Sequence, residues 1–332
     1  MSNTSHRSGG HTIGIVAGVL SALIALILIL NRQYIIDQVN IWQFHPSSAV
    51  EQLSTRSSMN NAGKFYFFAS LPTLESTQAF NGKCDRKEES TAILGCYTAQ
   101  RIYIYDVKDA RLDGIREVTA AHEMLHAAYE RMGDAERAKV DALLETEYAK
   151  LKNDKELADR MAFYDRTEPG QRDNELHSVI GTEIASISPE LEDHYKKYFT
   201  DRKVVVELHA KYASVFTDLQ NRSEELVSEL KNLGDTIEKD TLTYNNDVNQ
   251  LNRDIQSFNT RADSGSFNSQ AQFELERSSL VVRADQLDTK RNQINDDVAR
   301  YEILRKELTS VSSESEALNR SIDSSLAPAP SI

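Results

Sequence analysis

The chain has 332 residues, of which 40% are hydrophobic and 27% are charged, an ordinary composition for a folded protein. Its formal net charge is −13 and no block of like charge stands out, which argues against a nucleic-acid partner because phosphate binding needs clustered lysines and arginines. Proline and glycine are scarce, at 6 and 13 residues, so long disordered linkers are not expected over most of the length.

An uncharged apolar segment covers residues 12–30, after a short polar N-terminus at 1–11. As a helix it would be about 28 Å long, close to the hydrocarbon thickness of a bilayer. A cleaved signal peptide is the alternative, but the segment exceeds the usual apolar length of about 7–15 residues and no A-x-A-like cleavage site follows. We therefore predict a single-pass transmembrane helix that anchors the protein to a membrane.

The orientation of this anchor is only weakly indicated by charge. Arg7 precedes the segment and Arg32 follows it, so the positive-inside comparison is nearly balanced. Two cysteines, Cys84 and Cys96, are either two free thiols or a disulfide, and a disulfide would require an oxidising compartment. The short N-terminus and this possible disulfide favour an extracytoplasmic body at the cell membrane.

The next elements follow from local composition. Residues 31–62, Ser- and Asn-rich from 47 onward, are expected to form a tether or loop. Aromatic and β-branched runs predict strands at 64–69 and 101–105, with a third at 92–97. Helical periodicity predicts a series of helices after this small sheet, at 113–132, 134–152, 154–164, 174–187 and 189–215.

Beyond residue 205 the pattern becomes a heptad repeat with charged and amide residues between the apolar positions. The first run contains Leu219, Leu226, Leu230, Leu233, Ile237, Tyr244, Val248, Leu251, Ile255 and Phe258. The second contains Leu287, Ile294, Val298, Tyr301, Leu308, Val311, Leu318 and Ile322. Turn-forming residues at 262–269 separate the runs, so an antiparallel coiled-coil hairpin is expected, available for self-association or a protein partner.

The segment His122-Glu123-Met124-Leu125-His126 carries the chemistry. Histidines four apart lie on one helix face and can bind the same metal ion, and Zn²⁺ is the cofactor that this HExxH spacing indicates. Glu123 lies one step round the helix and is placed to act as general base for a water that the metal activates. The surrounding segment lacks proline and has apolar positions at helical spacing. The alternative to a metal site is a surface helix on which the two histidines have this spacing by chance.

A catalytic zinc needs a third protein ligand, and the HExxHxxGxxH extension is absent because Tyr129 and Met132 occupy its last two places. The downstream Asn174-Glu175 with Ser178 resembles the N-E-x-x-[A/S] signature of the gluzincin zinc peptidases. That resemblance covers about 110–190 and implies a zincin-like fold, a peptidase activity and Glu175 as the third ligand. Val179 departs from the family, many members of which have an Asp there that supports a zinc histidine.

Glu183 is a rival third ligand, because its position on the apolar stripe of the same helix predicts a buried carboxylate, and buried carboxylates are usually paired or metal-bound. His177 is a third option. The resemblance also implies a side chain that stabilises the oxyanion, for which His177, His194 and Tyr195 are candidates by proximity. Packing roles are the alternative for each of them.

These elements indicate an α+β, mostly helical protein. Its segments are a tether (31–62), a zincin-like domain (63–204), a coiled-coil hairpin (205–322) and a disordered tail (323–332). The expected function is that of a membrane-anchored zinc peptidase acting on a protein or peptide, which would pair with an open strand edge. The alternative is a non-catalytic coiled-coil adhesion or scaffold protein that carries a relic zincin domain.

Overall fold

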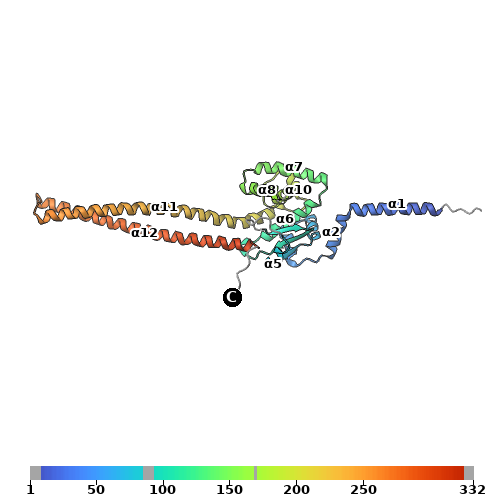
Figure 1. Ribbon diagram of the computed structural model, residues 1–332, viewed down its shortest axis with the longest axis horizontal. Helices are drawn as coiled ribbons and strands as arrows, with labels where there is room; N and C mark the ends of the chain where they lie inside the picture. The colour runs from blue at the N-terminus through green and yellow to red at the C-terminus, as the bar shows by residue number, and fades with distance from the viewer. Residues whose placement is uncertain (1–8, 85–92, 168–169, 325–332) are drawn as a thin grey trace, which may run out of the picture. The chain divides into compact units, whose positions relative to one another are not determined.

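The computed structural model describes residues 9–84, 93–167 and 170–324 (Figure 1). The chain divides into two compact units, one formed by Met1–Val215 with Asn319–Ile332 and the other by Phe216–Leu318. The predictions for 1–8 and for 325–332 lie outside the described residues.

The protein is mostly helical with one small sheet, as the sequence predicts. The first unit begins with α1 (Gly9–Leu30), α2 (Arg32–Gln43), α3 (Ser48–Arg56), α4 (Asn61–Ala69), β1 (Thr73–Glu75), α5 (Thr77–Asn81), β2 (Gly95–Thr98) and β3 (Arg101–Tyr105). A 3-10 turn, η1 (Ala110–Leu112), leads into α6 (Ile115–Glu130), α7 (Asp134–Leu151), α8 (Lys155–Thr167), α9 (Arg172–Thr182) and α10 (Pro189–Tyr195). Two long helices, α11 (Arg202–Asp263) and α12 (Gln270–Ile322), complete the chain.

Among the described residues the sheet has the strand order β1-β3-β2, which makes β2 one of its two edge strands. β1 runs parallel to β3 with Thr73 opposite Tyr103, and β2 runs antiparallel to β3 with Cys96 opposite the same tyrosine. Alternation along β3 buries Ile102 and Ile104 completely. Helix α6 packs against β2 and β3, which places the HEMLH segment beside the edge strand.

Two expectations about the segment before the sheet are wrong. Residues 64–69 form a helix rather than a strand, because Asn60 caps α4 by accepting hydrogen bonds from the backbone N–H groups of Ala62 and Gly63. Residues 47–62 are not a loop, since Ser47 caps α3 in the same way. The apolar face of α3, with Val50 and Leu53, belongs to the hydrophobic core of the first unit.

Helix α1 contains the apolar segment, and its described side chains from Ile15 to Leu30 are exposed. Among the residues that the structure describes, no single helix is long and apolar enough to cross a membrane. Ile15–Leu30 and Arg32–Gln43, bent by 69° at the break between them, pass the same test as a pair.

The helices predicted after the sheet are present with shifted ends. Glu183 terminates α9, so the helix predicted over 174–187 stops earlier. The helix predicted over 189–215 is divided into α10 and the beginning of α11. Of the tail predicted over 323–332, only Asp323 and Ser324 are described, and Ser324 is buried with its carbonyl accepting a hydrogen bond from Asn81.

The second unit consists of the middle of α11 and most of α12, which lie antiparallel and side by side. Leu226, Leu230 and Leu304 form its buried core. Ion pairs such as Arg283–Asp254 and Lys290–Asp240 connect the two helices along their length. The connection between α11 and α12 falls within 262–269, where the turn residues predict it, and Phe258, Phe267 and Phe273 pack on one another there.

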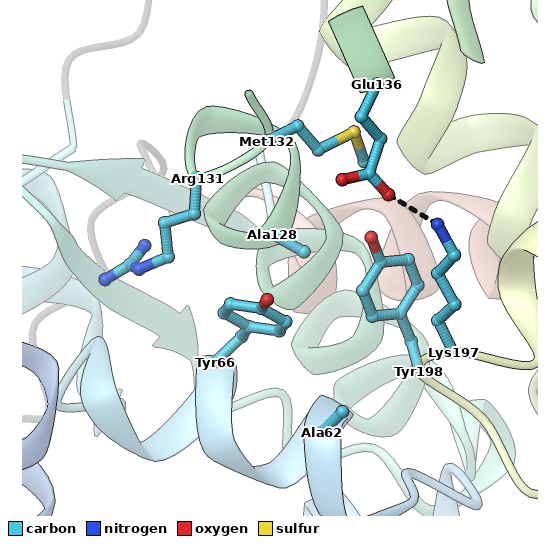
Figure 2. A pocket seen from close by; sticks show the side chains of 8 residues that line it. All are labelled: Ala62, Tyr66, Ala128, Arg131, Met132, Glu136, Lys197 and Tyr198. Carbon is cyan, nitrogen blue, oxygen red and sulfur yellow. Dashed lines mark hydrogen bonds and ion pairs between the residues drawn. The ribbon is translucent and has the colours of Figure 1, made fainter. Parts of the chain in front are cut away.

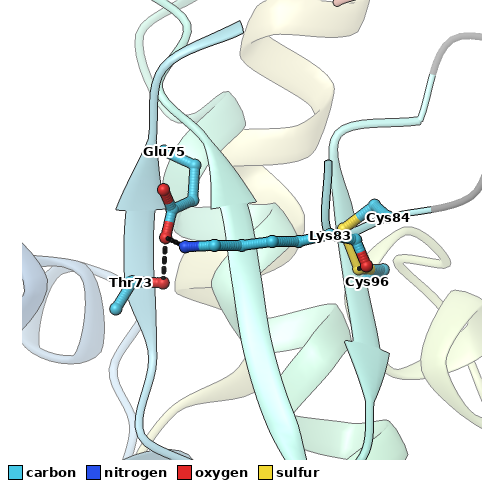
Figure 3. Close-up of a disulfide and its surroundings, with 5 residues drawn as sticks. All are labelled: Thr73, Glu75, Lys83, Cys84 and Cys96. Carbon is cyan, nitrogen blue, oxygen red and sulfur yellow. Dashed lines mark hydrogen bonds and ion pairs between the residues drawn. A yellow bond between two sulfur atoms is a disulfide. The ribbon is translucent and has the colours of Figure 1, made fainter. Parts of the chain in front are cut away.

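Cys84 and Cys96 are joined as a disulfide, which decides between the two alternatives left open by the sequence. Figure 3 shows that the bond ties the edge strand β2 to the segment that follows α5. Next to it the Lys83 side chain crosses one face of the sheet to pair with Glu75 on β1, and its ammonium group lies over the ring of Tyr103. The edge strand is therefore held covalently as well as by its hydrogen bonds to β3.

Candidate metal centre

Helix α6 presents the HEMLH segment at the surface of the core. It begins after Gly114, whose φ of +106° favours glycine and allows a close approach to Leu208. Its buried face packs on the sheet and on α9. His122 and His126 lie at the margin of this face, with side chains 17% and 15% exposed. The two imidazoles are thus accessible but held by a rigid helix.

Glu175 completes a group of three side chains that can hold a metal ion. Its Oε2 atom lies 3.6 Å from His122 Nε2 and 3.4 Å from His126 Nε2. The ligand atoms of the three residues all lie within 4.8 Å of one another. Two ligands at the usual zinc distances of about 2.0–2.1 Å with tetrahedral geometry are about 3.3 Å apart, so this spacing fits such a site. Two imidazoles and one carboxylate are also the ligand types found in catalytic zinc sites.

The ring of His126 is oriented by the residues next to Glu175 on α9. The His126 Nδ1–H donates to Asn174 Oδ1 at 3.0 Å, and Ser178 Oγ lies 3.2 Å from the same nitrogen. Asn174 in turn donates its amide N–H to Gln171 Oε1, which points its oxygen toward the histidine. A hydrogen bond at Nδ1 leaves Nε2 free to bind a metal. Asn174 therefore fixes the ring of His126 with its Nε2 atom toward Glu175.

The charges of this group are strongly coupled. Burial would raise the pKa of Glu175, but the charge and hydrogen bonds of His122 and His126 hold that pKa well below its ordinary value. Burial lowers the pKa of His126, and the hydrogen bond and charge of Glu175 outweigh this effect and raise that pKa to about 9. Glu175 therefore favours a positive charge on the imidazole of His126 beside it.

Glu123 lies beside this group but is itself 5% exposed. Burial raises its pKa, and the charges of His126 and His122 oppose the rise. The strand β2 lies directly against it at Gly95. A Cβ atom at Gly95 would be 2.6 Å from Glu123 Oε1 and equally close to Thr119 Cγ2. A side chain at Gly95 would therefore displace Glu123, Thr119 or the strand, a constraint that the sequence does not reveal.

Glu183 does not join the histidines. It forms an ion pair of 2.8 Å with Arg160 on α8, and its other oxygen lies 3.6 Å from His209 Nε2 on α11. The sequence predicts that this carboxylate is either paired or metal-bound, and in the structure it is paired with Arg160. Arg160 and His209 lie close enough to the metal group for the charges of Glu175 and His122, respectively, to affect their pKa values. Neither residue is evident from the sequence, because both come from other helices.

The three oxyanion candidates are engaged with one another. His177 and His194 are hydrogen-bonded through their Nε2 atoms at 2.9 Å, and the hydroxyl of Tyr195 donates to the carbonyl of His177 at 2.7 Å. All three side chains are buried. Burial lowers the pKa of His194 to about 4, which keeps this imidazole neutral. These contacts match the packing role that the sequence analysis weighed as the alternative.

Arg202, the first residue of α11, fixes the end of α9, the helix that carries Glu175. Its buried guanidinium donates to the carbonyls of Ile180, Ile184 and Ala185 and pairs with Glu192. Ile180 lies in the last turn of α9, where the free carbonyls of a helix C-terminus attract a cation, and Ile184 and Ala185 follow the end of the helix. The position of Glu175 therefore depends on a residue that lies outside its own helix.

Two cavities of the first unit lie away from His122, His126 and Glu175. One of about 100 Å³ is found near the end of α6, where Figure 2 shows Glu136 paired with Lys197 beside Tyr66 and Tyr198. A second, of about 450 Å³, is lined by residues of α2 and α4 together with Arg131. Neither is lined by His122, His126 or Glu175.

No model of a protein family matches the chain significantly, and neither a curated protein nor a solved structure does so.

Proposed function

We propose that the protein is a membrane-anchored zinc peptidase in which His122, His126 and Glu175 hold the metal and Glu123 is the general base. The observation that carries this proposal is the convergence of the three ligand atoms within 4.8 Å, from two helices, next to a buried carboxylate. The spacing of the HEMLH segment alone was a moderate signal. Its completion by Glu175 and the orientation of His126 by Asn174 support a site built for a metal.

Bound zinc would supply Lewis acidity and lower the pKa of a coordinated water. Glu123, whose pKa is raised by burial, accepts the proton of the attacking water and delivers it to the leaving nitrogen. The oxygen of the water forms the new bond to the carbonyl carbon, the C–N bond breaks, and the products are a carboxylate and an amine. The edge strand β2, whose Gly95 contacts Glu123, is the surface on which an extended peptide would bind by adding a strand.

The anchor and the location belong to the same proposal. The exposed apolar side chains of Ile15–Leu30 form a surface far larger than soluble proteins tolerate, which supports residues 12–30 as a membrane span. Arg32 and Asp37 in α2 support an end of the span near Asn31. The Cys84–Cys96 disulfide favours an oxidising compartment and hence an extracytoplasmic body.

For the second unit we propose a coiled-coil hairpin that binds a protein partner or a second copy of the chain. The leucine core and the ion pairs between α11 and α12 support this interpretation. Exposed apolar side chains such as Leu275 and Ile303 offer additional surface for such contacts.

The test uses the full chain purified in detergent. We expect one zinc per chain and cleavage of an unstructured protein such as casein, with zinc retained but cleavage abolished in Glu123→Gln. Glu175→Ala should lose zinc, whereas Glu183→Ala should keep it. Absence of zinc from the wild-type chain, or equal cleavage by Glu123→Gln, would refute the peptidase and leave the non-catalytic scaffold as the better account.

A further inference from the structure

The metal group lies close to the proposed membrane surface because α2 fastens the sheet to the end of the apolar segment. Gln33 follows Leu30 by only three residues. Its side-chain amide exchanges two hydrogen bonds with that of Gln100, at 2.9 and 3.3 Å. Gln100 and Ala99 form the turn between β2 and β3, both with positive φ. The tip of the β2–β3 hairpin is therefore held beside Gln33, at a similar distance from the proposed bilayer.

Further contacts of α2 keep this arrangement from depending on one amide pair. Asp37 forms a two-bond ion pair with Arg131 at the end of α6, at 2.8 and 2.9 Å, and the two side chains are only 3% and 6% exposed. The same guanidinium donates to the hydroxyl of Tyr97 on β2. Asn40 donates to the carbonyl of Ala69 at 2.9 Å. Helix α2 is thus bound to the catalytic helix and to the edge strand together.

The edge strand leads from this hairpin tip to the catalytic carboxylate. It runs from Gly95, which contacts Glu123, to Thr98 next to the turn. At about 3.3 Å per residue, the path from Gln100 back to Gly95 is about 17 Å at most. The catalytic carboxylate is therefore within roughly 20 Å of the level of Gln33.

The remaining distance to the bilayer is short. Three residues after Leu30 add about 5 Å as helix or about 10 Å if extended. The headgroup layer occupies about 5–8 Å of that space. The active site therefore lies about 30 Å or less from the hydrocarbon edge, a distance that about nine residues of extended chain span.

We propose that the substrate is a membrane-inserted polypeptide cut within about ten residues of the point where it leaves the bilayer. This proposal rests on the peptidase function and on the anchor at 12–30. A chain emerging from the membrane beside the hairpin tip would bind along β2 toward Gly95 and reach Glu123 without crossing the body of the enzyme.

The test places the full chain in phosphatidylcholine vesicles with single-span test polypeptides that carry one target sequence. In one substrate the target lies in the first ten residues outside the span, and in the other a helical spacer of forty residues raises it by about 60 Å. We expect at least tenfold faster cleavage of the first. Equal cleavage of both substrates would overturn the proximity proposal but leave the peptidase proposal intact. If neither membrane substrate is cleaved, and the target is not cleaved as a free peptide either, both proposals are overturned.

A spacer variant of the enzyme gives an independent check. Insertion of ten Gly/Ser residues between Leu30 and Asn31 lengthens the connection to the membrane but keeps every contact of α2 with the body. We expect this variant to cleave the free peptide at the wild-type rate and to accept targets farther from the membrane. An unchanged distance preference would contradict the proposal.

Discussion

Substitution of Gly95 by alanine tests whether strand β2 positions Glu123, the proposed general base. The new Cβ would lie 2.6 Å from Glu123 Oε1, against an ordinary contact of at least 3.4 Å, so strand or carboxylate must move by about 0.8 Å (3.4 minus 2.6). Overpacking of this kind costs about 1–3 kcal/mol of stability. A misplacement near 1 Å in a catalytic group reduces the rate by about 100-fold.

We therefore expect Gly95→Ala to keep its zinc, because His122, His126 and Glu175 are not displaced directly, and to lose about 10- to 100-fold in kcat. Peptide cleavage and zinc content would be measured on the same preparation. Gly133→Ala is the matched control, since no atom lies within 4 Å of the Cβ it would add. A Gly95→Ala enzyme with wild-type kcat would refute the claim that the strand holds Glu123 in place.

Three further predictions concern stability. Asp37→Ala leaves Arg131 buried without its partner, so unfolding in detergent should show a loss of about 3–5 kcal/mol, and a loss below about 1 kcal/mol would contradict the buried pairing. The folded-state pKa of His194, about 4, lies below its unfolded value of about 6.5, so its contribution is complete above pH 6.5 and is lost as the pH falls toward 4, by at most about 1.4 kcal/mol per pH unit. The free energy of unfolding, measured in EDTA, should therefore decrease less between pH 7 and pH 5 in His194→Asn than in the wild type. An equal decrease in both proteins would exclude the effect. Replacement of Cys84 and Cys96 by serine should cost about 3 kcal/mol for this short loop. A reductant should remove the difference from wild type, and insensitivity of the wild type to reductant would count against the bond.

The helices and the strand at 101–105 were predictable because their signals are local. The HEMLH helix lacks proline and shows apolar positions at helical spacing, and β3 has a β-branched and aromatic run of strand length. Residues 64–69 have an equally strong strand composition and nevertheless form α4. Their conformation is decided by the cap at Asn60 and by packing of α4 against α6, and neither depends on the composition of the run itself.

The choice of the third ligand shows where sequence reasoning about the site reaches its limit. Glu175 and Glu183 lie on α9 or at its end, and both are carboxylates that a helical wheel can place near the histidines. What separates them is Arg160, which neutralises Glu183 from a different helix, while nothing but His122 and His126 is paired with Glu175 in the ion pairs of the described residues. This distinction depends on tertiary contacts, which cannot be inferred from the spacing of residues along α9.

The same reasoning applies to the start of α11. The heptad pattern places the boundary of the hairpin near residue 205, yet α11 is continuous from Arg202 and its first turns belong to the first unit up to Val215. Apolar periodicity indicates that a helix has a buried face, but it does not indicate which neighbouring element covers that face. Here the first turns carry polar groups with a separate purpose, since Arg202 holds the end of α9 and His209 Nε2 lies 3.6 Å from Glu183. The support of the metal group and the beginning of the long hairpin are consequently parts of one helix, so a change at its first residue should reach Glu175 through α9 rather than through the hairpin.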